Sequence, residues 1–65
     1  MKKFLVVNDQ TEERTELDID SLCEMLEDYG LDDFSIEVTR TWAISAKSGE
    51  SENLCPYAPY FIMCL

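Results

Sequence analysis

The spacing of apolar residues predicts one amphipathic helix in the first half of the chain. Residues 18–30, DIDSLCEMLEDYG, place Asp18 as N-cap and Gly30 as the residue that ends the helix. Ser21 with Glu24 also matches a capping box, which starts the helix three residues later. The apolar positions recur every three or four residues and form a single stripe: Ile19, Leu22, Cys23, Leu26 and Tyr29.

Strands are predicted on both sides of this helix. The run Phe4–Val7 is apolar, favours β structure and stops at a turn signal, Asn8-Asp9. Residues 14–17 suit a short returning strand or a plain loop. Residues 34–47 alternate between apolar and polar, which predicts a long strand covered on one face. The apolar register of that segment contains one charged exception among Phe34, Ile36, Val38, Arg40, Trp42, Ile44 and Ala46.

The last third of the chain predicts a loop and a final strand. Residues 47–53 have loop composition, and residues 57–64 are apolar. Pro56 and Pro59 confine that strand to a sheet edge or to a start after Pro59. The last two predicted strands form an antiparallel hairpin. The expected class is α+β in one domain, residues 1–65, with one amphipathic helix packed on a three- to four-stranded mainly antiparallel sheet. Its order is strand, optional short strand, helix, strand, strand.

Several side chains carry two interpretations. Lys2 and Lys3 beside the first strand are typical of edge protection and solubility. Arg40 either packs its stem with its head at a rim carboxylate, or forms a salt bridge that orders the acidic face. Trp42 anchors the core, or becomes an exposed contact residue if the opposite sheet face is covered. The same two interpretations apply to the aromatic residues of the last strand, Tyr57, Tyr60 and Phe61.

Net charge narrows the classes of partner. The 65 residues hold 14 acids and 5 bases, so the net charge is −9. Such a charge disfavours direct contact with nucleic acid or anionic membranes and favours a basic protein partner. The cysteines Cys23, Cys55 and Cys64 are odd in number, and no signal peptide or membrane span is evident. We therefore expect free thiols and a cytoplasmic protein.

Catalysis and metal binding find little support in the sequence. The chain has no His and no glycine-rich phosphate loop, and Cys55 has no identifiable basic partner. Asp32-Asp33, or Asp9 with Glu13, offer oxygen ligands suited to calcium or magnesium, but the EF-hand spacing is absent. The sequence predicts a protein that is not an enzyme and that has no cofactor and no metal.

The distribution of acids is the strongest functional signal. Residues 9–37 contain twelve acids against Arg14 alone, a net charge of −11. Carboxylates four residues apart on a helix rise about 6 Å along its axis, close to the spacing of about 7 Å or less between phosphates along a nucleic-acid strand. The alternative is the solvated acidic face of an ordinary small protein. The candidate partner-binding residues are Asp20, Glu24, Glu27, Asp28, Asp32, Asp33, Glu12, Glu13 and Glu16.

In size, charge and lack of enzymatic motifs, the chain resembles the very small acidic proteins of bacteriophages and mobile elements. Examples are anti-CRISPR proteins, anti-restriction proteins and inhibitors of uracil-DNA glycosylase. The resemblance implies an inhibitor that acts in the host cytoplasm. Such a protein binds a basic nucleic-acid-handling protein and blocks its nucleic-acid site by charge mimicry. Two alternatives remain: an interaction module or small regulator that uses the aromatic C-terminal hairpin, and a small metal-binding or thiol-reactive protein.

Overall fold

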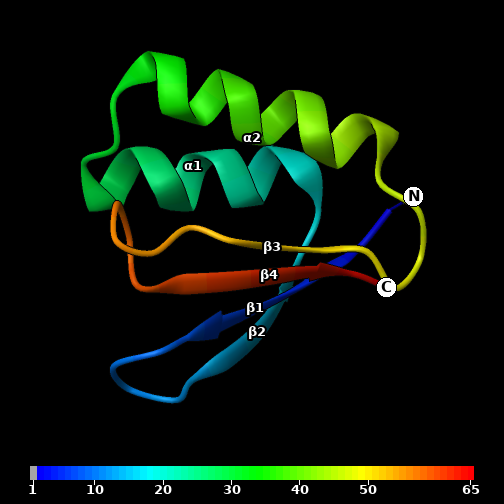
Figure 1. Ribbon diagram of the computed structural model, residues 1–65, viewed down its shortest axis with the longest axis horizontal. Helices are drawn as coiled ribbons and strands as arrows, with labels where there is room; N and C mark the ends of the chain where they lie inside the picture. The colour runs from blue at the N-terminus through cyan, green and yellow to red at the C-terminus, as the bar shows by residue number, and fades with distance from the viewer. Residues whose placement is uncertain (1) are drawn as a thin grey trace.

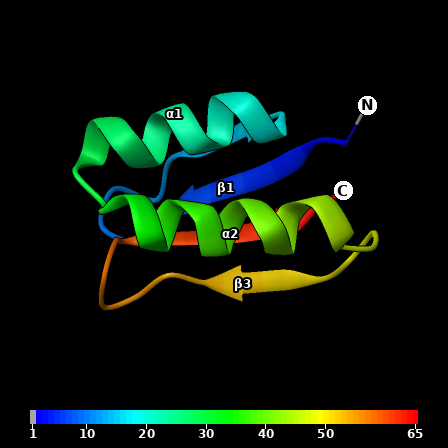
Figure 2. The same cartoon turned by 90° about the horizontal axis from the view of Figure 1, so that it is seen from above.

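The computed structural model describes residues 2–65 and contains two helices over one four-stranded sheet (Figure 1). The strand order is β2-β1-β4-β3, and every neighbouring pair is antiparallel. Both helices lie on the same face of the sheet, side by side (Figure 2). The elements in chain order are β1 (Phe4–Asn8), β2 (Arg14–Leu17), α1 (Ile19–Tyr29), α2 (Asp33–Ser45), β3 (Ser51–Asn53) and β4 (Tyr60–Cys64).

The first two strands form the hairpin that their sequence predicts. The Asn8 side chain accepts hydrogen bonds from the backbone N–H groups of Gln10 and Thr11, at 2.8 and 3.1 Å, which closes the turn. Glu12 takes the left-handed conformation, with φ 63°. The strand over residues 4–7 and the short returning strand are both confirmed, and the plain-loop alternative for residues 14–17 is wrong.

Helix α1 begins and ends where the sequence predicts. Asp18 is the N-cap, and its Oδ1 accepts a hydrogen bond from the Ser21 backbone N–H at 2.8 Å. This bond lowers the pKa of the Asp18 carboxyl. At the other end Gly30 has φ 109°, and the N–H of Leu31 donates to the carbonyl of Leu26 at 3.2 Å, which completes a Schellman motif. The later start at a Ser21 capping box is wrong.

The prediction of a strand over residues 34–47 is wrong, because residues 33–45 form the helix α2. The helix buries its small side chains, Thr39 and Ala43, with Ala46 just beyond its end. These three residues follow a three- to four-residue period that the alternation of larger residues obscured. Hydroxyl groups within the helix donate back to carbonyls four residues earlier, as Thr41 does to Glu37 at 2.9 Å. Tertiary packing thus overrides the β preference of the branched residues.

The C-terminal strands differ from the prediction in their partners. The predicted loop 47–53 contains β3, which pairs with β4 as an antiparallel neighbour. Strand β4 begins directly after Pro59, which confirms the second of the two predicted alternatives. It lies between β1 and β3, so the first alternative, a strand at the sheet edge, is wrong. A hairpin between residues 34–47 and the last strand does not form.

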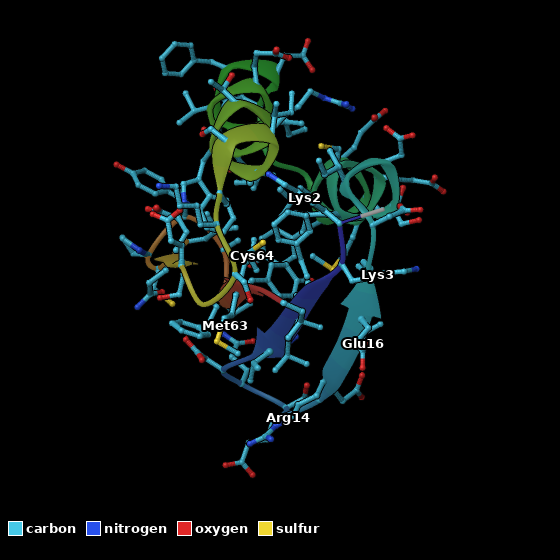
Figure 3. The ribbon with its side chains drawn as sticks, turned by 90° about the vertical axis from the view of Figure 1, so that its right-hand side faces the viewer. Lys2, Lys3, Arg14, Glu16, Met63 and Cys64 are labelled. Atoms are coloured by element: carbon cyan, nitrogen blue, oxygen red, sulfur yellow. The ribbon has the colours of Figure 1, made fainter. Side chains whose placement is uncertain are left out.

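The core lies between the sheet and the helices. Alternation along β1 and β4 sends Phe4, Val6, Ile62 and Cys64 toward the helices, where all four are buried. In Figure 3 Cys64 points up toward the helices and Met63 points to the opposite side. No described element covers that opposite side. We call it the outer sheet face, and its apolar side chains are half-buried: Leu5, Val7, Phe61 and Met63.

The fold is therefore α+β, with two helices and a four-stranded antiparallel sheet where the sequence predicts a single helix. Strand β1 is central, so edge protection is the wrong interpretation of Lys2 and Lys3. The Lys2 ammonium instead donates to three carbonyls at the end of α2. Neither of the helices in residues 2–65 is long and apolar enough to cross a membrane.

Candidate protein-binding surface

Helix α1 presents four carboxylates to solvent along one side. Its apolar stripe is held against the molecule by Leu22 and Leu26, both fully buried. The opposite side therefore faces outward, and its acids are three or four residues apart, the spacing of neighbours on a helix surface. We call this set the acidic row: Asp20, Glu24, Glu27 and Asp28. All four residues are exposed, so the prediction that α1 carries an exposed acidic side is confirmed.

Little positive charge balances the acidic row. Within residues 2–65 one ion pair forms, between Arg40 Nη1 and Asp20 Oδ1 at 3.4 Å, and the two side chains are 37% and 90% exposed. So exposed a pair adds little stability. Arg40 thus forms a salt bridge with the acidic face, as the second interpretation predicts, but the bridge reaches Asp20 alone, at one end of the row. Glu24, Glu27 and Asp28 form no ion pair with any residue in 2–65.

A groove runs between α1 and the edge strand β2, and the acidic row forms part of its wall. Glu24 and Asp28 line it together with the apolar side chains of Leu17, Met25 and Tyr29. The Tyr29 ring is fixed by an edge-on contact with Tyr60, with ring centroids 5.5 Å apart. This arrangement suits the side chain of Lys or Arg, whose apolar stem packs on Met25 or Tyr29 while its charged head meets a carboxylate.

Asp32 and Asp33 lie where α1 turns into α2, at the end of the helix pair seen on the left of Figure 2. Both are exposed. The nearby Ser35 hydroxyl and the backbone N–H groups at the start of α2 lower the pKa of the Asp32 carboxyl, although its side chain forms no capping hydrogen bond. These two acids continue the negative surface beyond the C-terminal end of the acidic row.

The remaining three predicted residues do not join the acidic row. Glu12 and Glu13 belong to the connection between β1 and β2. Glu16 pairs opposite Leu5 in β2, and Figure 3 shows its side chain directed away from the helices. These three candidate residues therefore lie apart from the acidic row, and their part in partner binding stays a prediction. The sheet register decides which face Glu16 occupies, and the sequence alone does not fix that register.

The aromatic residues of the C-terminal segment point to different parts of the molecule. Tyr57 is 75% exposed in the loop before β4, Tyr60 packs on Tyr29, and Phe61 lies on the outer sheet face. They therefore do not form one aromatic surface. Trp42 is half-buried with its ring centroid 5.8 Å from that of Phe4, so it serves as a core anchor that keeps one exposed edge.

Sequence reasoning missed the exposed apolar side of α2. Phe34 and Val38 are 76% and 55% exposed, although a strand prediction had placed them in the core. The signal that identifies the correct face is the period of small residues, Thr39, Ala43 and Ala46, which marks where the helix packs closely. The larger apolar residues then fall on the solvent side.

All three cysteines are free thiols, with Cys23 and Cys64 buried and Cys55 exposed. Burial raises the pKa of Cys23. The Cys55 thiol donates to Asp9 Oδ2 at 3.3 Å, and this bond raises the pKa of Cys55 as well. A nucleophilic cysteine needs the opposite shift, since the thiolate is the reactive form.

We expect iodoacetamide at pH 7.5 to modify Cys55 first, and Cys23 and Cys64 only after denaturation, when three thiols per chain react. Replacing Asp9 with Asn removes the carboxylate that holds the proton on Cys55. Alkylation of Cys55 should then be about two- to fivefold faster, because a larger fraction is thiolate. The control is Glu12→Gln in the same connection, which leaves the rate unchanged. Equal rates in all three proteins would show that Asp9 does not control this thiol.

No group of three or more His, Cys, Asp or Glu side chains within residues 2–65 is arranged to hold a metal ion. Asp32 with Asp33, and Asp9 with Glu13, therefore do not extend into such a cluster. Comparison with protein-family models, with curated proteins and with solved structures finds no match to this chain.

Proposed function

We propose that this protein is an inhibitor that binds a basic nucleic-acid-handling protein and occupies its nucleic-acid site. CRISPR effectors, restriction enzymes and repair enzymes are the classes of target that the resemblance to small phage proteins suggests. The observation that carries the proposal is the acidic row, an ordered and exposed line of carboxylates with one weak ion pair at its end. A surface needed only for solubility has no reason to concentrate like charges in this way.

The rigidity of α1 supports mimicry of a phosphate backbone. The helix is capped at both ends and anchored by fully buried leucines, so its carboxylates keep their spacing without the partner. Successive acids four residues apart rise about 6 Å, and a groove built for phosphates about 7 Å apart or less accepts them. Asp32 and Asp33 extend the charged line past the helix end. The groove between α1 and β2 gives arginine and lysine stems of the partner an apolar contact.

The partner is sought by capture on immobilised protein from a lysate at low salt, followed by elution with rising salt. The proposal expects a basic nucleic-acid-binding protein that elutes early in the gradient, since exposed charge pairs are screened by salt. DNA or RNA oligonucleotides added in excess should release the same protein. Release by salt but not by either nucleic acid would contradict occupation of the nucleic-acid site.

A matched pair of variants then tests the acidic row. One variant carries Glu24→Gln, Glu27→Gln and Asp28→Asn; the other carries Glu12→Gln, Glu13→Gln and Glu16→Gln. Each removes three negative charges and changes the net charge from −9 to −6. The row variant should associate with the captured protein about tenfold more slowly at low salt and with a smaller salt dependence, because local charge steers association.

The association rate of the control variant should stay within about threefold of that of the unmodified protein, because overall charge steers association weakly compared with local charge. Association rates measured against salt concentration for the three proteins decide the question. If the two variants lose rate equally, net charge alone acts, and the row has no special role.

A second candidate function is an interaction module that uses the C-terminal hairpin. The observation in its favour is the outer sheet face, where Phe61 and Met63 of β4 lie beside Val7 and Leu5 of β1 without a covering element among residues 2–65. An apolar patch on a central pair of strands is typical of a protein contact. Capture that resists high salt and is lost in a Phe61→Ser variant favours this function over the first.

A further inference from the structure

A second groove separates α2 from the edge strand β3, which lies at the edge of the sheet opposite β2. Figure 2 shows β3 running alongside α2. The volume of the groove is about 570 Å³, within the usual range for binding sites. We call it the α2–β3 groove. Its lining includes Asp32, Phe34, Val38, Trp42, Glu52 and Tyr57. It shares no residue with the acidic row, although Asp32 belongs both to this lining and to the negative surface that continues beyond the row.

On the helix side of this groove, large apolar side chains of α2 are exposed to solvent instead of packing against the rest of the molecule. Phe34 and Val38 are four residues apart on α2, and Trp42 is four residues further, so the three side chains follow one line on the helix surface. Tyr57 faces the same groove from the loop before β4 and is 75% exposed. Four large apolar side chains thus surround a space that no described part of the chain fills.

The floor of the groove ends at an unpaired strand edge. Strand β3 pairs with β4 only. The bonds from Cys64 N–H to the Glu50 carbonyl and from Leu54 N–H to the Tyr60 carbonyl show that Glu50 and Leu54, which flank β3, direct these groups toward β4. Antiparallel strands alternate, so Glu52 also faces β4, whereas Ser51 and Asn53 direct their N–H and C=O groups away from it. These groups are available to a further strand.

The charge of the groove indicates which segment fits. The lining includes the carboxylates of Asp32 and Glu52 and no Lys or Arg. Glu52 pairs opposite the buried Ile62, so its side chain lies on the helix-facing side of the sheet, inside the groove. An occupant therefore gains from basic residues near Glu52 and Asp32 and from apolar residues against α2.

We propose that the α2–β3 groove binds an extended segment of a partner protein as a fifth strand along β3. The segment hydrogen-bonds to the backbone of Ser51 and Asn53. Its side chains alternate, and those on the helix-facing side reach over Glu52 toward Val38, Trp42 and Tyr57. The preferred segment carries apolar residues together with Lys or Arg.

The test starts with a phage-displayed library of random nine-residue peptides selected on the full protein. The expected result is enrichment of sequences that combine β-forming apolar residues with Lys or Arg. An enriched peptide is then synthesised and titrated at 0.15 M salt. Trp42 is the only tryptophan and lines the groove, so its fluorescence reports occupancy directly. Amide signals of Ser51 and Asn53 should shift and exchange more slowly with solvent.

Two substitutions test the backbone hydrogen bonds along β3 and the apolar contact with α2 separately, and each has a matched control. Ser51→Pro deletes an outward N–H, whereas Ser51→Ala keeps it. Val38→Glu places a charge in the groove, whereas Ile44→Glu makes the same change on the same helix at a residue that is 60% exposed and outside the groove lining. Affinity should fall about tenfold or more for Ser51→Pro and Val38→Glu, and by less than about threefold for the controls.

Three results would overturn the proposal. The first is a selection that enriches no peptide over the starting library. The second is an enriched peptide that binds equally well after Val38→Glu and Ser51→Pro, or that perturbs α1 rather than β3, which places the contact elsewhere. The third is a change in the Ser51 and Asn53 signals with protein concentration alone, which shows that a second copy of the chain occupies the edge.

Discussion

Replacing Leu26 with Ala should unfold this protein at room temperature or lower its melting temperature by more than about 10 °C. Leu26 is fully buried on α1. Removing a buried leucine side chain costs about 2–5 kcal/mol through lost burial and the cavity left behind. A 65-residue domain has a total stability of about 3–10 kcal/mol. One substitution therefore removes a large part of the whole, and each kcal/mol shifts the melting temperature by about 4–8 °C.

The measurement is thermal unfolding followed by far-ultraviolet circular dichroism. Leu22→Ala should behave in the same way, since Leu22 is equally buried and belongs to the main core cluster. The control is Leu65→Ala, the same chemical change at a side chain that is 48% exposed. Its melting temperature should lie within a few degrees of that of the unmodified protein, because an exposed substitution changes the free energy of unfolding by about 0.5 kcal/mol. A Leu26→Ala protein that melts like the control would show that α1 is not held by its apolar stripe.

Helix α1 was predictable because its signals are local and agree with one another. Apolar spacing, the Asp18 cap and Gly30 at the C-terminal end all concern residues within a few positions of each other. The position directly after the last helical turn has a left-handed backbone conformation, which strongly favours glycine. The hydrogen bonds that close both helix ends need no contribution from distant parts of the chain, so the sequence specified them in advance.

Helix α2 was not predictable in the same way, because its signals conflict. Ile36, Val38 and Ile44 favour strands, and the two-residue alternation around Trp42 matches a half-buried sheet. The helix forms because α1 and the sheet offer a surface that small side chains can approach closely, at Thr39, Ala43 and Ala46. That surface exists only once the rest of the chain is folded, so tertiary contacts decide the outcome.

The same distinction applies to the candidate sites. The acidic row follows directly from helix periodicity, so the sequence indicated it correctly. The separation of Glu16 from that row depends on strand register, and the α2–β3 groove depends on residues from a helix, a strand and a loop. Surfaces assembled from distant segments emerge only from the three-dimensional arrangement.

Lys2 should contribute about 1–3 kcal/mol to the free energy of unfolding, because its ammonium group caps the C-terminal end of α2 from outside the helix. Helix α2 has no basic residue in its last turn and no glycine that closes its C-terminal end. The Lys2 Nζ donates instead to the carbonyls of Ala43 and Ala46, at 3.2 and 2.8 Å, and to that of Ile44. These carbonyls carry the negative end of the helix dipole, so an ammonium group there is stabilising. Figure 3 shows Lys2 extended toward α2, while the neighbouring Lys3 points away from it.

Lys2→Met keeps the apolar stem but removes the charge and all three N–H donors. The Ala43 carbonyl then loses its ammonium donor, and the Ala46 carbonyl keeps only the weak hydrogen bond from the Cys64 thiol at 3.8 Å. The melting temperature should fall by about 5–15 °C. Lys3→Met makes the same change in net charge at an exposed side chain and should shift melting by less than a few degrees, or about 0.5 kcal/mol. Thermal unfolding at low and high salt separates the helix-dipole contribution from the hydrogen-bond contribution. Added salt weakens the dipole interaction but does not restore the lost hydrogen bonds. Equal melting of the two variants would mean that α2 ends without help from Lys2, and that the link between the N-terminus and the second helix contributes nothing to stability.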